Sequence, residues 1–227
     1  SEQRIGAALR GRRDRAVVST KLGYGVPGVP DWTGPCITAG IELALERLAT
    51  TWLDIAHLHS CPLDVLRRGD VIEALAAARQ AGKIRVAAYS GDNEPLLWAI
   101  ESGRFGAVQC SVNVADQRAL DRAIPLAGER GLGVLAKRPL ANGAWREAVR
   151  PDAPDRGAYW DRLSAMGVTL TAARALGFVL AQPVSSVLVG TTRIEHLEAM
   201  ARTGADPEAE QLRALFRRHD RGWDGVI

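Results

Sequence analysis

The regular alternation of short β-rich runs with helical patterns is the feature that most constrains this chain. Six apolar, β-branched runs each precede a segment with helical spacing, and they span residues 16–20, 53–59, 84–90, 107–113, 133–137 and 185–190. No Asn-Gly turn separates two of these runs in the way that a hairpin requires. Strict alternation of this kind predicts a parallel sheet with helices packed outside it.

The expected helices follow from apolar spacing and from end signals. Ile37, Ile41 and Leu45 fall on one helical face, and Gly82 is placed to end another helix. The expected helices cover residues 1–12, 37–48, 71–81, 94–101, 117–129, 171–180, 194–201 and 208–218. A Gly/Pro-rich loop follows the first run, and a long stretch that contains Pro, Gly and Trp precedes residue 167.

Two architectures fit this order of elements, namely an open doubly wound sheet and a (β/α)8 barrel. The first run lacks the GxGxxG sequence that marks many dinucleotide-binding open sheets. Polar residues or glycine instead stand at the carboxyl ends of the runs: Lys21, His59, Ser90, Asn113, Lys137 and Gly190. Because that end of a barrel carries the chemistry, we predict one (β/α)8 TIM-barrel domain over residues 1–227, with two strands unaccounted for.

Composition excludes several classes of protein. The chain is 47% apolar and 24% charged, which is typical of a globular protein, and no run approaches the 18 apolar residues of a membrane helix. Its net charge of +3 is scattered and its aromatic content is 5%, so we expect no nucleic-acid binding. Three cysteines without a CxxC pair predict neither a disulfide framework nor a metal site, and favour the cytoplasm.

Several segments, in order, resemble the aldo/keto reductase family. Lys21 in VVSTKLG matches the family's active-site lysine, and His59 in LDIAHLHSCP matches its active-site histidine. Ser90 in GKIRVAAYS and Gln109 in AVQCSVN match residues that bind the carboxamide of a nicotinamide. Only three of the 29 basic residues are lysines, which also draws attention to Lys21, because the pKa of an amine can be shifted and that of a guanidinium cannot.

The segment SSVLVGTTRIEHLEAM resembles the family's phosphate- and adenosine-binding segment. Backbone N–H groups and hydroxyls at a helix start suit a phosphate, and an arginine there suits the 2′-phosphate of NADP. The resemblance therefore implies cofactor contacts by Gly190, Thr191, Thr192 and Arg193, with the pyrophosphate near Lys137 and Arg138.

Some positions depart from the family pattern. Gly91 stands where an asparagine often adds a carboxamide contact, and Lys137 stands where an aromatic ring often stacks on the nicotinamide. Ala199 and Met200 replace polar side chains that commonly hold adenine. These departures imply a cofactor site that has diverged and that holds adenine weakly.

The resemblance also implies catalytic residues that this chain does not contain. Family members open with a hairpin, two strands and a helix that include a catalytic Asp and Tyr, and residues 1–11 resemble the segment just after that tyrosine. We therefore expect the 227-residue chain to be nearly inactive, and to self-associate through open barrel edges. Tyr24 is a weaker candidate for the acid, and His57 is better explained as a buried histidine.

Together these residues favour an oxidoreductase that uses NADP to reduce a small-molecule aldehyde or ketone, without a metal. In the family a tyrosine protonates the developing alkoxide; Lys21 would lower the pKa of that phenol and His59 would orient the carbonyl. The alternative is a non-catalytic barrel that binds a nucleotide or a partner as a regulatory or structural subunit. The absent acid and the diverged adenine site would favour that alternative if Ser1 were the true start of the protein, whereas an upstream DxxxxYG motif would favour the enzyme.

Overall fold

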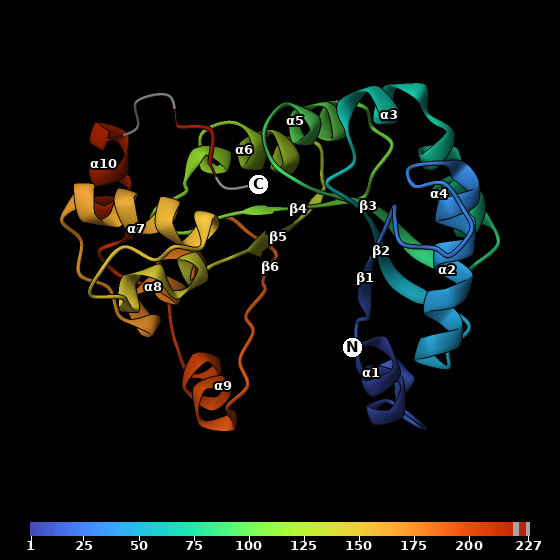
Figure 1. Cartoon of the computed structure of the whole chain (residues 1–227), viewed down its shortest axis with the longest axis horizontal. Coiled ribbons are helices and arrows are strands. Elements are labelled where there is room, and N and C mark those ends of the chain that lie inside the picture. Colours follow the sequence, from blue (N-terminus) through green and yellow to red (C-terminus); the bar gives the residue numbers. More distant parts are fainter. Residues whose placement is uncertain (220–222, 226–227) are drawn as a thin grey trace. The chain divides into compact units, whose positions relative to one another are not determined.

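The computed structural model describes residues 1–219 and 223–225, and its six strands form one sheet in chain order (Figure 1). The strands are β1 (Ser19–Leu22), β2 (Leu53–His59), β3 (Ile84–Ser90), β4 (Ala107–Ser111), β5 (Gly133–Lys137) and β6 (Ser186–Val187). β1 pairs with β2, β2 with β3 and β5 with β6, all in parallel. The predicted α/β class is confirmed, and the sheet is that of a partial (β/α)8 barrel.

The expected helices are all present; α9 has the predicted bounds, and the ends of the others are shifted. They are α1 (Glu2–Ala8), α2 (Gly34–Leu48), α4 (Asp70–Gln80), α5 (Asn93–Glu101), α6 (Ala123–Glu129), α8 (Ala172–Leu180), α9 (Ile194–Ala201) and α10 (Ala209–His219). Short 3₁₀ helices cover Arg13–Arg15, Arg118–Leu120 and Ala141–Arg146. The segment expected as one helix over 117–129 is therefore a 3₁₀ turn followed by α6.

Two helices and the bounds of three strands differ from the sequence expectation. The structure adds α3 (Leu63–Arg68) and α7 (Pro154–Met166), for which the sequence predicted no element, although Tyr159, Leu163 and Met166 of α7 stand at helical spacing and are buried. The first strand begins at Ser19 and not at residue 16, because the backbone N–H of Val18 donates to the carboxylate of Asp54 (2.8 Å). β1 extends to Leu22 and not only to residue 20, and β4 ends at Ser111 and not at residue 113. The last strand is limited to two residues.

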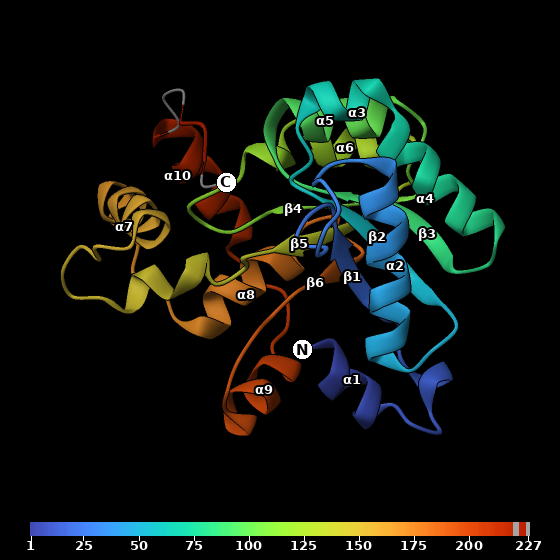
Figure 2. The same ribbon diagram turned by 45° about the vertical axis from the view of Figure 1, so that its right-hand side comes forward.

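The chain divides into two compact units, which we describe separately. The first unit comprises residues 1–108 and 130–132 and contains β1, β2 and β3 with helices α1 to α5. α2 packs on β1 and α4, and α4 packs on β3, so both helices lie on the same side of these strands (Figures 1 and 2). The predicted apolar stripe of α2, which includes Ile37 and Ile41, is buried against them.

The second unit comprises residues 109–129 and 133–227, of which the structure describes all but 220–222 and 226–227. It contains β5 and β6 with helices α6 to α10. α10 packs on α7 and α8, and α8 packs on α9. Phe178 of α8 and Phe216 of α10 are completely buried in its core. Within the described parts of the chain, no helix is both long enough and apolar enough to cross a membrane.

A buried carboxylate ties the amino-terminal end of β2 to its neighbours. Asp54 accepts hydrogen bonds from Arg13 (Nη2 to Oδ2, 2.7 Å), Arg85 (Nη1 to Oδ1, 2.7 Å) and the N–H of Val18. The two guanidinium groups also lie over the ring of Trp52, with the Cζ atoms of Arg13 and Arg85 at 4.6 and 5.2 Å from the ring centroid. Burial by itself would raise the pKa of Asp54, but the Val18 hydrogen bond and the Arg13 pair outweigh it, so the pKa lies below its usual value.

We expect Asp54→Asn to lower the free energy of unfolding at neutral pH by about 1–3 kcal/mol, because buried donors lose a charged partner. Asp14→Asn is the matched control, since Asp14 is exposed, and it should change stability by less than about 0.5 kcal/mol. A carboxyl group whose pKa is lowered on folding stabilises the folded protein at pH values above its unfolded pKa. The difference in unfolding free energy between the unaltered protein and Asp54→Asn should therefore shrink as the pH falls below about 4. Urea unfolding at several pH values measures this; equal stability of both variants would contradict it.

Candidate functional site

The first unit brings Lys21, His59 and Ser90 to the carboxyl ends of neighbouring strands. Lys21 of β1 lies opposite His57 of β2, and His59, the last residue of β2, lies opposite Ser90, the last residue of β3. Ser90 is buried, His59 is half-buried and Lys21 is exposed. The parallel register therefore places an amine, an imidazole and a hydroxyl at one end of this three-stranded part of the sheet. Their catalytic and cofactor roles remain predictions.

His57 lies on the same strand but in a different environment. It is completely buried, and its Nε2 lies 2.9 Å from the hydroxyl oxygen of Ser19. Burial, followed by the positive charge of Lys21, lowers the pKa of His57 to about 4, so it is neutral near pH 7.

Tyr24 reaches His59 from the loop after β1. Its hydroxyl forms a hydrogen bond with Nδ1 of His59, and the two rings stack with centroids 5.5 Å apart and planes at 28°. The sequence suggested Tyr24 only as a weak substitute for an acid. Its contact with His59 was missed, because a position three residues beyond Lys21 does not say in which direction a loop side chain points.

The glycine at position 91 has a steric explanation in the first unit. A Cβ atom at Gly91 would collide with the hydroxyl and ring of Tyr89. Tyr89 is buried, and its hydroxyl donates to the carbonyl of Cys61 (3.3 Å). An asparagine at position 91 is therefore incompatible with this placement of Tyr89.

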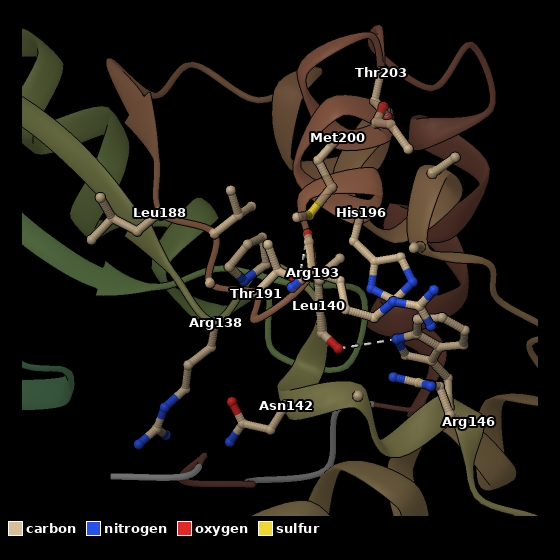
Figure 3. Close-up of a pocket in the computed structure, with 18 of the residues that line it drawn as sticks. Arg138, Leu140, Asn142, Arg146, Leu188, Thr191, Arg193, His196, Met200 and Thr203 are labelled. Atoms are coloured by element: carbon tan, nitrogen blue, oxygen red, sulfur yellow. Dashed lines mark hydrogen bonds between the residues drawn. The ribbon is translucent and has the colours of Figure 1, made fainter.

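The second unit contains a large open cavity of about 1110 Å³ (Figure 3). Its walls come from residues 138–140 after β5, the 3₁₀ segment 141–146, the start of α8, and α9 with the loop before it. Of the predicted cofactor residues, the cavity is lined by Arg138, Gly190, Thr191, Thr192 and Arg193, and also by Ala199 and Met200. Gln109, buried in β4, and Lys137, half-buried at the end of β5, do not line it.

The turn before α9 is shaped by one hydroxyl. Thr191 Oγ1 accepts a hydrogen bond from the N–H of Arg193 (3.1 Å), and it lies 3.3 Å from the carbonyl oxygen of the same residue. Gly190, Thr192 and the Arg193 side chain are exposed, and the guanidinium of Arg193 pairs with Glu195 at 3.5 Å. The hydroxyl of Thr191 thus helps to build the turn, while the exposed groups beside it remain accessible to an anion.

Two residues of the cavity that carry or can carry a positive charge were not predicted from the sequence. Arg146 and His196 both line it, and Figure 3 shows both on the side of the cavity where Arg193 lies. His196 follows Arg193 by three residues, so helical spacing on the predicted helix 194–201 was a usable signal. Arg146 lies in the stretch for which the sequence predicted no element, and no pattern pointed to it. Among the described residues, no group of three His, Cys, Asp or Glu side chains is arranged to hold a metal ion.

Comparison with known proteins places this geometry in context. Residues 1–214 match the model of the Aldo/keto reductase family. The chain belongs to the aldo/keto reductase family. Among curated proteins, L-galactose dehydrogenase from Arabidopsis thaliana is 27% identical over 87% of this chain and 67% of its own length. Aldo-keto reductase ausK from Emericella nidulans is 26% identical over 95% of this chain and 65% of its own length.

A solved structure gives the same fold. The holo form of aldo-keto reductase AKR11C1 from Bacillus halodurans aligns with a TM-score of 0.79 at 24% identity, covering 98% of this chain and 78% of that one. The chain therefore spans about two thirds of the length of the curated relatives, and over three quarters of this structural neighbour. The resemblance stated from the sequence is confirmed.

We expect the buried neutral His57 to make the protein less stable in mild acid. Its pKa falls from about 6.5 when unfolded to about 4 when folded, so protons favour the unfolded chain between these values. From about pH 7.5 to about pH 5 the free energy of unfolding should drop by about 2 kcal/mol on this account. His57→Gln should lose most of this dependence, and His196→Gln, in an exposed helix, should retain it. A His57→Gln variant with an unchanged pH profile in urea unfolding would contradict the assignment.

Proposed function

We propose that this chain is part of an oxidoreductase that reduces an aldehyde or ketone with NADP as cofactor. One observation carries the proposal, namely the register that brings Lys21, His59 and Ser90 to the carboxyl ends of three paired strands in a member of this family. The names of the two curated relatives, a dehydrogenase and an aldo-keto reductase, agree with redox chemistry. Both compact units would then belong to one barrel domain.

The residues of the first unit suit the carbonyl side of such a reaction. A bound nicotinamide would supply the hydride. The charge of Lys21, which already lowers the pKa of His57, would lower the pKa of an acid placed beside it and stabilise the anion left after proton transfer. His59 would donate a hydrogen bond to the carbonyl oxygen and thereby orient it.

The cavity of the second unit fits the nucleotide part of the cofactor. Its volume suits a ligand larger than most drugs, and Arg138, Arg146 and Arg193 give it positive charge. A 2′-phosphate needs such charge together with hydrogen-bond donors, which the exposed groups around Thr192 provide. NADP is therefore favoured over NAD. Ala199 and Met200 offer adenine only apolar contact, so the affinity should be modest.

Two further expectations belong to this proposal. The enzyme would work in a reducing cytoplasm, where the buried free thiols of Cys36, Cys61 and Cys110 stay reduced. β1 and β6 stand at the two ends of the strand order in the described residues, and exposed strand edges promote self-association.

We expect Arg193→Gln to weaken NADPH binding about tenfold and to leave NADH binding within about twofold, because only NADPH carries the 2′-phosphate. The matched control is Arg202→Gln, which removes the same group from the end of α9 where it pairs with Glu198 outside the cavity. Trp145 lines the cavity, so its fluorescence reports both titrations. Equal affinity of the unaltered chain for NADPH and NADH would contradict NADP as the cofactor.

Lys21→Met should lower kcat for carbonyl reduction by about 100-fold or more, since the positive charge that assists proton transfer is lost. Lys83→Met is the control, because Lys83 precedes β3 at the opposite end of the strands and pairs with the exposed Glu42. The assay measures NADPH oxidation with 4-nitrobenzaldehyde. It uses the 227-residue chain or, if that chain does not reduce the aldehyde, a form extended at the amino terminus that does. Equal losses in both variants would contradict a catalytic Lys21. NADPH binding without turnover in any form would favour the non-catalytic alternative.

A further inference from the structure

The loop between β1 and α2 is folded tightly, and it presents Tyr24. Gly23 has a φ of +137°, and a Cβ atom there would collide with the indole of Trp32. The N–H of Trp32 donates to the carbonyl of Gly23 (2.8 Å), and the N–H of Gly25 donates to Oδ1 of Asp31 (3.0 Å). Arg68 at the end of α3 donates from Nη2 to the carbonyl of Trp32 (2.6 Å). The loop is thus held by its own hydrogen bonds and by α3.

Within this loop, Tyr24 is held by ring contacts and one hydrogen bond. Its ring stacks on the imidazole of His59, as described above, and meets the edge of Trp32 at 5.8 Å and 67°. Its hydroxyl is hydrogen-bonded to Nδ1 of His59. The residue is 49% exposed, so general burial does not explain its position. Its contacts with the rings of His59 and Trp32 hold it in place.

The polarity of this hydrogen bond depends on the tautomer of His59, because a phenol can donate to an unprotonated Nδ1 or accept from Nδ1–H. A phenol is a stronger donor than acceptor, which favours donation by the hydroxyl of Tyr24 to an unprotonated Nδ1. If the hydroxyl donates to Nδ1, that nitrogen carries no proton, so the ring proton of His59 resides on Nε2. This tautomer makes Nε2 a hydrogen-bond donor, which is the property needed to hold a carbonyl oxygen.

We propose that Tyr24 is a positioning residue for His59. The hydroxyl of Tyr24 holds the imidazole in the Nε2–H tautomer, and the stacked ring fixes the plane of the imidazole. His59 is thereby set to donate to a substrate carbonyl. The carbonyl step rests on the proposed function, whereas the tautomer is a property of the protein alone.

The tautomer can be measured without substrate or cofactor. Long-range ¹H–¹⁵N spectra of the labelled 227-residue chain distinguish the two ring nitrogens, and His59→Gln identifies the signals. We expect the Nε2–H form of His59 to dominate, and Tyr24→Phe, which keeps the ring, to give a mixture of tautomers. Tyr89→Phe is the control, since it removes a hydroxyl bonded to a carbonyl and not to His59. A dominant Nδ1–H form, or a tautomer ratio unchanged in Tyr24→Phe, would overturn the proposal.

Kinetics provide the second readout. In a form of the protein that reduces 4-nitrobenzaldehyde, Tyr24→Phe should lower kcat about tenfold while the Kd for NADPH changes by less than about twofold. An unchanged kcat despite an altered tautomer would overturn the positioning role. If no form of the unaltered protein turns over, the reductase assignment fails and the carbonyl step fails with it. The tautomer ratio then still decides whether Tyr24 controls His59.

Discussion

The parallel hydrogen-bonded register of β1, β2 and β3 is the constraint on which the candidate active site depends. Side chains alternate between the two faces of a strand, so a shift of one residue would turn Lys21 and His59 to the opposite face. The observed register pairs Lys21 with His57 and His59 with Ser90. The network around Asp54 supports it from the other end, because this carboxylate binds Arg85 of β3 and both Arg13 and Val18 of the segment before β1. Stability and chemistry thus depend on opposite ends of the same strands.

Much of the fold followed from periodicity. β2, β3 and β5 have the residue bounds expected from the sequence, because each is a short apolar run closed by a polar residue or a turn. Helix α7 was missed because it lies within a stretch rich in Pro, Gly and Trp that was interpreted as a loop, although Tyr159, Leu163 and Met166 have helical spacing and are buried. The start of β1 was misplaced because an N–H of the backbone is taken by a side chain distant in sequence, Asp54, and no local pattern reveals such a partner.

In the candidate site as well, residues at strand ends could be predicted from the sequence, and contacts made by loops could not. Lys21, His59 and Ser90 were found because strand ends can be read from the sequence, and the structure places them at one end of the first unit. The cavity of the second unit includes the predicted Arg138, Thr192 and Arg193, yet Gln109 and Lys137 do not line it. The partnership of Tyr24 with His59 depends on a loop conformation with several unusual backbone angles, and propensities do not specify those.

The contact of Tyr89 with Gly91 restricts how this protein can change over time. An asparagine introduced at position 91 would meet the phenol of Tyr89 first, so that step taken alone would be harmful. A smaller residue at position 89 taken alone would leave a void under a buried turn and cost stability. Neither substitution is favourable without the other, so position 91 can accept a side chain only together with a change at position 89. The glycine is thereby entrenched by its neighbour.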